Sequence, residues 1–200
     1  MANTTTKKIL VINGHPDSLS YNEALAQSYI DALKDNDSIE IKYLALHSLD
    51  FNPNLEYGYR KRTELEPDLL KALEYINWSD HTVWIHPLWW LGLPAIMKGF
   101  FDRAFLPGIA FTHNPDGETV GLFKGKTARI ITTGGDLDIN IYTDIYKSSG
   151  LIQLRDGILA YCGIQTIDTT FIGPMNNLTY EDRAFWLKEV DNYAYQDSLL

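Results

Sequence analysis

Three segments of the chain directly follow a short apolar run and carry residues that could contact a ligand. They cover residues 15–22, 87–91 and 132–136. The first holds the hydroxyls of Ser18 and Ser20, the amide of Asn22 and the backbone N–H groups at the start of an expected helix, which together suit a phosphate group. Capping of that helix by Ser20 explains the same residues equally well.

The other two segments suggest a flat ligand. Trp89 and Trp90 follow a buried run, where adjacent aromatic residues either cap the core or wall a pocket. The third segment begins Thr132-Thr133-Gly134-Gly135. These glycines favour the pocket, because they allow close approach of the backbone and leave N–H groups to face the carbonyl edge of a planar ring. A phosphate cradle, an aromatic wall and an amide-lined edge together predict a flavin site.

Other chemistry has weaker support. Residues 121–127 are one residue short of a P-loop and precede a strand instead of following one. His81 and His86 lie five positions apart on an expected strand, hence on opposite faces, so no metal site is expected. Cys162 lies in an apolar helix end, which is typical of a buried small side chain and not of a nucleophile.

Composition predicts one domain spanning residues 1–200, with residues 1–7 flexible. The formal net charge is −9, with no basic run longer than Arg60-Lys61-Arg62, so no nucleic-acid partner is expected. No apolar run approaches the roughly 20 residues of a spanning helix, which argues against membrane insertion. A single cysteine and a polar N-terminus without a signal-peptide core favour a cytoplasmic protein.

Apolar patterning predicts the elements that position these segments. Strands are expected at 9–12, 39–43, 81–86, 128–132 and 165–172, and helices at 25–33, 67–76, 94–105, 151–162 and 179–190. Long connections remain at 47–66 and 106–124. Strand and helix alternate five times, which implies an α/β fold with an open five-stranded parallel sheet and helices on both faces. Ligands of such sheets bind beyond the carboxyl ends of the strands, where the three segments lie.

At this point the sequence resembles a known family nearly end to end, the flavodoxin-like NAD(P)H:quinone oxidoreductases of the DT-diaphorase type. The resemblance rests on Asn13-Gly14-His15 with Ser20-Tyr21-Asn22, on residues 87–99, on Phe101-Asp102-Arg103 and on residues 132–135. It implies a flavodoxin-like fold that binds FAD, with FMN as the alternative, and uses NAD(P)H as co-substrate.

The resemblance also implies roles for single residues. Those that would contact the ribityl chain and pyrophosphate are His15, Ser20, Tyr21 and Asn22. Those that would contact the isoalloxazine are Pro87, Leu88, Trp89, Trp90, Leu91, Thr132, Thr133, Gly134 and Gly135. Arg183 matches a contact of the adenosine half of FAD, with a solvated helix charge as the alternative. Tyr142 or Tyr146 would act as the catalytic proton relay, and Trp90, Phe111 and His113 would shape the substrate pocket.

These inferences predict a two-electron reductase that passes hydride from NAD(P)H through bound flavin to a quinone-like acceptor. The alternatives are a flavodoxin-type electron carrier without reductase activity and a regulatory flavoprotein subunit of a transporter. A homodimer with the active site at its interface is expected, because residues 94–111 carry more apolar groups than one helix face hides. The alternative is that residues 106–124 fold back over their own helix.

Overall fold

The computed structural model describes residues 6–200 and contains one large parallel sheet. Its strands are β1 (Lys7–Asn13), β2 (Ile39–Ala45), β3 (His81–Leu88), β6 (Thr127–Gly134) and β7 (Gln165–Ile172). They pair in the order β2-β1-β3-β6-β7, so the predicted five-stranded parallel sheet is confirmed. Lys7 already pairs with Ile39 in β1, whereas the flexibility predicted for residues 1–5 lies outside the described residues.

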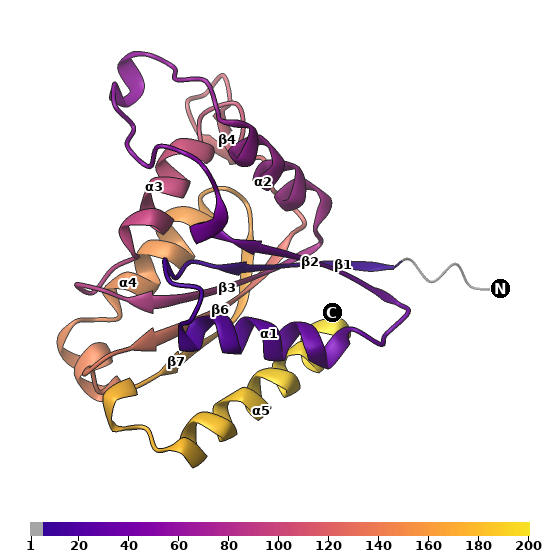
Figure 1. Cartoon of the computed structure of the whole chain (residues 1–200). Coiled ribbons are helices and arrows are strands. Elements are labelled where there is room, and N and C mark those ends of the chain that lie inside the picture. Colours follow the sequence, from indigo (N-terminus) through magenta and orange to yellow (C-terminus); the bar gives the residue numbers. More distant parts are fainter. Residues whose placement is uncertain (1–5) are drawn as a thin grey trace.

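Helices cover both faces of this sheet (Figure 1). On one face lie α1 (Tyr21–Leu33) and α5 (Tyr180–Ser198); on the other lie α2 (Pro67–Trp78), α3 (Ala95–Ala104) and α4 (Ser149–Ile152), which continues into a π-helical segment (Gln153–Ala160). Successive strand residues point to opposite faces, so Leu10 and Ile12 join the α2/α3 core while Ile9 and Val11 join the α1/α5 core. Burial on both faces explains why the strands read as continuous apolar runs.

Two helix starts follow from local sequence. Ser20 Oγ accepts a hydrogen bond from the backbone N–H of Glu23 and caps α1. Thr179 and Asp182 form the predicted capping box at α5, in which each side chain accepts from the backbone N–H of the other. Both caps fix a helix at the edge of the sheet where the strands end.

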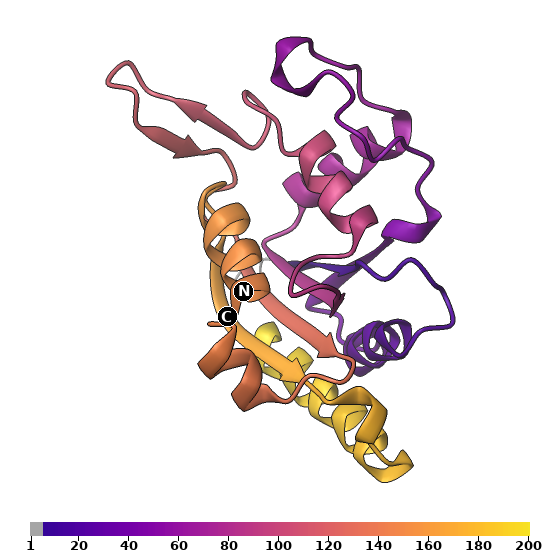
Figure 2. The ribbon, with the colours of Figure 1, turned by 90° about the vertical axis from the view of Figure 1, so that its left-hand side faces the viewer.

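The structure corrects the sequence prediction at the strand ends and in the connections. Strands β3 and β6 run two residues further than expected, so Leu88 and Gly134 lie within strands. The connection 106–124 contains an antiparallel hairpin of β4 (Phe111–His113) and β5 (Thr119–Gly121), which projects from the body of the protein (Figure 2). Strands of three residues are too short to produce a readable alternation in sequence.

The long connections pack onto helix α3. Arg103 is buried and donates to the carboxylate of Glu66 at 2.7 Å and to the carbonyl oxygens of Asn52 and Glu64, which ties residues 47–66 to the helix. Short helical turns occur at Leu46–Ser48, Gly58–Arg60, Ile141–Ile145 and Met175–Asn177. None of the helices formed by residues 6–200 is long and apolar enough to cross a membrane.

The apolar surplus around α3 is buried within the single chain. Phe100, Phe101, Phe105 and Leu106 are all at most 7% exposed. The ring of Phe123 packs on Phe105 with centroids 5.4 Å apart, so the connection covers its own helix. These four residues therefore need no two-fold partner to be buried, whereas Ile109 and Phe111 of the same set stay half-buried, and the homodimer remains a prediction.

Candidate functional site

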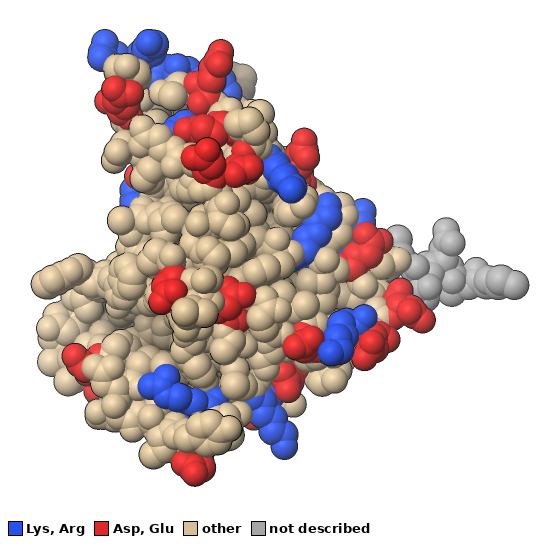
Figure 3. Space-filling view, viewed as in Figure 1, with Lys and Arg blue, Asp and Glu red and all other residues tan. Residues whose placement is uncertain are grey.

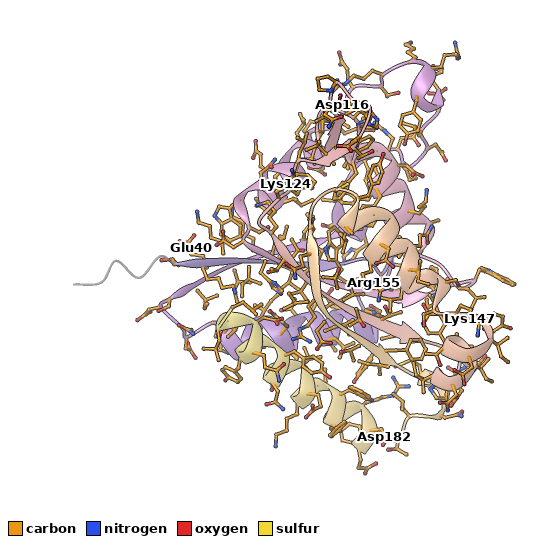
Figure 4. The ribbon with its side chains drawn as sticks, turned by 180° about the vertical axis from the view of Figure 1, so that it is seen from behind. Glu40, Asp116, Lys124, Lys147, Arg155 and Asp182 are labelled. Carbon is orange, nitrogen blue, oxygen red and sulfur yellow. The ribbon has the colours of Figure 1, made fainter. Side chains whose placement is uncertain are left out.

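The second and third predicted segments meet in a cleft beyond the carboxyl ends of β3 and β6. It has a volume of about 590 Å³ and is lined by Leu88, Trp89, Trp90, Leu91, Gly135, Asp136, Leu137 and Tyr146. Lys147, next to Tyr146 in the chain, marks this end of the sheet in Figure 4, and Asp182 marks the start of α5. The left-hand side of the face in Figure 3, where the strands end, is mostly uncharged. The walls of the cleft are thus mainly apolar, with Asp136 as the charged residue among those that line it, and the cleft suits a flat, largely apolar ligand.

A strained turn presents the wall of this cleft. Trp89 and Gly92 exchange two backbone hydrogen bonds of 3.0 Å, and the residues between them, Trp90 and Leu91, have φ angles of 52° and 61°. Left-handed backbone at non-glycine residues costs about 1–2 kcal/mol each. The turn leaves the indole of Trp90 fully exposed at the mouth of the cleft. Strain that presents an apolar ring to solvent points to a ligand contact.

The backbone around Gly135 leaves room for a ring. A Cβ built at Gly135 would meet no atom within 4 Å, whereas one at Gly134 would lie 2.3 Å from Cζ of Phe171. Gly134 is therefore glycine because of Phe171, and Gly135 is open toward the cleft. The sequence suggested the same role for both glycines, because it gave no sign of the ring of Phe171.

The first segment, 15–22, satisfies most of its own amides. Asn13 Oδ1 accepts from the N–H of His15, His15 Nδ1 accepts from that of Asp17, and Asp17 Oδ1 accepts from that of Leu19, each at 2.9 Å. The loop before the helix therefore satisfies most of its own N–H groups, and the free groups are those expected at the helix start. Among the hydrogen bonds of residues 6–200, the amides of Tyr21 and Asn22 at the start of α1 have no acceptor.

Two side chains here retain donors of their own. Because His15 Nδ1 accepts a hydrogen bond, the proton of the neutral ring lies on Nε2, and burial lowers the pKa of His15 and favours this neutral form. Asn22 is 3% exposed; its Oδ1 accepts from Thr133 Oγ1 at 3.0 Å, while its Nδ2 has no acceptor among the described residues. An unpartnered buried amide beside free helix N–H groups fits an anionic oxygen.

The threonine side chains of the third segment hydrogen-bond to neighbouring residues of the site and do not line the cleft. Thr133 orients Asn22, and Thr132 Oγ1 lies 3.2 Å from Nε2 of His86. Burial lowers the pKa of His86 to about 4, so this histidine is neutral and donates from Nδ1 to the carbonyl of Pro87. Ligand contacts of Thr132 and Thr133 would come from their backbone atoms.

The two candidate proton-relay residues differ in position. The ring of Tyr142 stacks on Phe171 at 5.0 Å, and its hydroxyl accepts from the N–H of Leu151 at 2.9 Å. Tyr142 is 2% exposed and is not among the cleft residues, so the structure does not support it as a relay. Tyr146 lines the cleft and is exposed. Sequence spacing could not separate the two, since they are one helical turn apart.

Arg183 links the first turns of α5 and α1. Its Nη2 donates to the carbonyl of Met175 at 2.8 Å, its guanidinium lies 5.3 Å from the ring centre of Tyr21, and the Tyr21 hydroxyl donates to the Arg183 carbonyl at 2.6 Å. Burial raises the pKa of Tyr21. Arg183 is thus half-buried beside the first segment and is held by contacts within the chain, and its role toward FAD stays a prediction.

Phe111 and His113 lie on the hairpin and do not reach the cleft of their own chain. Their rings pack with centroids 5.9 Å apart, and Phe111 contacts Tyr161 at 5.0 Å. The prediction had placed them in the site of a neighbouring subunit, which a single chain does not test.

Other reactive groups are not poised for chemistry. Burial raises the pKa of the Cys162 thiol to about 12. Residues 6–200 hold no cluster of three or more His, Cys, Asp or Glu that could bind a metal ion.

The fold and this cleft define a flavodoxin-like α/β protein with a candidate ligand site at the carboxyl ends of the strands. Residues 7–194 match the Flavodoxin_2 family, described as a flavodoxin-like fold, and the chain belongs to this family, as predicted. A Haemophilus influenzae protein named "Uncharacterized NAD(P)H oxidoreductase" is 29% identical over 185 residues, 88% of this chain and 87% of that protein. Rat NAD(P)H dehydrogenase [quinone] 1 is 26% identical over 188 residues, 83% of this chain and 68% of that protein. The crystal structure of Smu.1420 from Streptococcus mutans superposes with a TM-score of 0.81 at 27% identity, over 94% of this chain and 99% of that one.

Proposed function

We propose that the chain is a flavin-dependent NAD(P)H:quinone oxidoreductase. The observation that carries this proposal is the open backbone of Gly135 opposite Trp89 and Trp90 in an apolar cleft. A bound flavin would supply the redox chemistry, taking hydride from NAD(P)H and giving two electrons to a quinone-like acceptor. Relatives named NAD(P)H oxidoreductase and NAD(P)H dehydrogenase [quinone] support this assignment.

The chain's own groups would bind and orient this cofactor. The free amides of Tyr21 and Asn22, Asn22 Nδ2 and the Nε2–H of His15 would donate to its phosphate oxygens. The indoles would shield the ring from water, and backbone N–H groups near Gly135 would stabilise negative charge on its carbonyl edge. Tyr146 would hold or pass a proton at its hydroxyl, from its place in the cleft wall.

Several finer assignments belong to the same proposal. FAD is favoured over FMN because Arg183, beside Tyr21 at the first segment, could hold the adenosine half. A second copy of the chain would bring Phe111 and His113 from its projecting hairpin to the cleft, completing the substrate pocket of a homodimer. The enzyme would work in the cytoplasm.

The visible spectrum of the purified protein tests the function. Anaerobic addition of NADH or NADPH should rapidly bleach the visible absorption band of the oxidised flavin. Later addition of a simple quinone should reoxidise the flavin and restore the band. A bound flavin that neither nucleotide reduces would identify an electron carrier, and a protein that binds no flavin would refute the proposal.

A further inference from the structure

Behind segment 15–22 lies a buried polar network that joins three elements. Asn13 ends strand β1, Glu23 lies in the first turn of α1, and Tyr43 lies on β2. Asn13 is fully buried, and the other two side chains are half-buried. None of the three lines the cleft, so the site as described leaves their role open.

The hydrogen bonds of this network converge on one carboxylate. Asn13 Nδ2 donates to Glu23 Oε2 at 2.8 Å, the hydroxyl of Tyr43 donates to the same oxygen, and Gln27 Nε2 donates to Oε1 at 2.9 Å. Asn13 Nδ2 also lies 3.3 Å from the hydroxyl of Tyr43. Three donors on one carboxylate lock the side chain of Glu23 toward β1 and β2.

The same residues hold both ends of the segment. At its start, Asn13 Oδ1 accepts from the N–H of His15 at 2.9 Å. At its end, the N–H of Glu23 donates to Ser20 Oγ, and Glu23 directly follows Tyr21 and Asn22, whose amides are free. Tyr43 is thus linked by hydrogen bonds to the two residues that hold the ends of the segment, Asn13 and Glu23.

The direction of the hydrogen-bond donors is important for phosphate binding at this segment. Residues 13–22 contain no lysine or arginine, so this segment would hold a phosphate through amide, hydroxyl and imidazole donors. Such bonds weaken steeply with misalignment, whereas attraction between ions depends only weakly on direction. The carboxylate of Glu23 must also be held away from the anion that these donors would bind.

We propose that Tyr43 is a positioning residue for phosphate recognition, acting through Glu23 and Asn13 on segment 15–22. The inference rests on the proposed flavin site. It predicts that the hydroxyl of Tyr43 contributes to the binding of the flavin phosphate and not to the binding of the ring.

The test compares FMN with riboflavin, which lacks the phosphate, on the full-length chain freed of flavin. In Tyr43→Phe the dissociation constant of FMN, measured by quenching of flavin fluorescence, should rise about tenfold while that of riboflavin changes less than about twofold. Tyr75→Phe is the matched control, because the hydroxyl of Tyr75 has no hydrogen bond among residues 6–200, and it should leave both constants unchanged. Glu23→Gln keeps an oxygen for Tyr43 and should retain the preference for FMN.

A second measurement works without flavin. Amide hydrogen exchange at His15 should accelerate in Tyr43→Phe and stay at the wild-type rate in Tyr75→Phe. A wild-type protein that binds FMN no better than riboflavin would overturn the phosphate site and the network's role together. A wild-type preference for FMN that Tyr43→Phe retains would overturn only the role of Tyr43, and equal losses for FMN and riboflavin would show a merely structural effect.

Discussion

Two polar regions lie at opposite ends of the same sheet and differ in how completely their hydrogen bonds are used. At the amino ends of the strands, the carboxylate of Asp197 on α5 accepts from Arg129 at 2.7 and 2.8 Å and from Tyr29 at 3.0 Å. His81 Nε2 lies 3.2 Å from the same carboxylate but outside hydrogen-bond geometry, so this one ring nitrogen of the cluster is incompletely paired. At the carboxyl ends, the amide of Asn22 lacks an acceptor, Gly135 faces open space and Trp90 is strained and exposed.

The difference separates a structural cluster from a binding site. Buried polar groups that bond to one another leave no free donor or acceptor for a ligand. The bonds to Asp197 at the amino ends of the strands instead hold α5 against the sheet. Donors left without partners cost stability unless something else supplies an acceptor. The amino-end cluster should therefore control folding, and the carboxyl-end site should control binding.

The largest expected effect is at the amino-end cluster. Asp197→Ala leaves Arg129 buried with Asp168 as its one remaining anionic partner among residues 6–200, so the free energy of unfolding should fall by about 3–5 kcal/mol. Chemical denaturation measures this loss. The exposed pair Arg155–Asp156, whose arginine is labelled in Figure 4, provides the control, since Asp156→Ala should cost less than about 1 kcal/mol. Equal losses in the two variants would contradict the comparison.

Acid should destabilise the protein through a buried histidine near the carboxyl end. Burial lowers the pKa of His86 from 6.5 to about 4. Between pH 6.5 and about pH 4, His86 is therefore protonated in the unfolded chain and neutral in the folded chain. This contribution is complete above pH 6.5 and is lost as the pH falls toward 4, by about 3 kcal/mol. Unfolding measured across this range should show a steeper decline in the wild type than in His86→Gln. Parallel curves would place the titrating group elsewhere.

Two neighbouring glycines sharpen the distinction between folding and binding. Gly135→Val should weaken flavin binding about a hundredfold, near 2.7 kcal/mol, with little change in stability, because the new side chain enters the open cleft. Gly134→Ala should instead lower the unfolding free energy, since its Cβ would meet the ring of Phe171. Flavin titration and denaturation of both variants would measure the two effects. Wild-type flavin affinity in Gly135→Val would remove the principal support for the cleft as the ring site.

The smallest effect concerns the two flavins. If Arg183 holds the adenosine half of FAD, Arg183→Ala should weaken FAD binding by about 1–2 kcal/mol and leave FMN binding unchanged. Arg183 also donates to Met175, so stability is measured in parallel. Equal losses for FAD and FMN would assign Arg183 to packing against Tyr21 alone.

The sequence by itself determined the sheet and its helices, and it singled out the three segments of the candidate site. Buried strands such as β1 read as continuous apolar runs, and Ser20 and Thr179 act through local hydrogen bonds, so neighbouring residues suffice to predict them. The family followed from motifs of the same local kind.

Tertiary structure decided which of those residues keep a free donor. The amide of Asn22 is oriented by Thr133, 111 positions away, and Tyr142 is withdrawn from the cleft by Phe171. The covering of α3 by residues 106–124 likewise depends on contacts between Phe105 and Phe123. Burial and hydrogen-bond partnership are properties of segments brought together by folding, and no spacing along the chain records them.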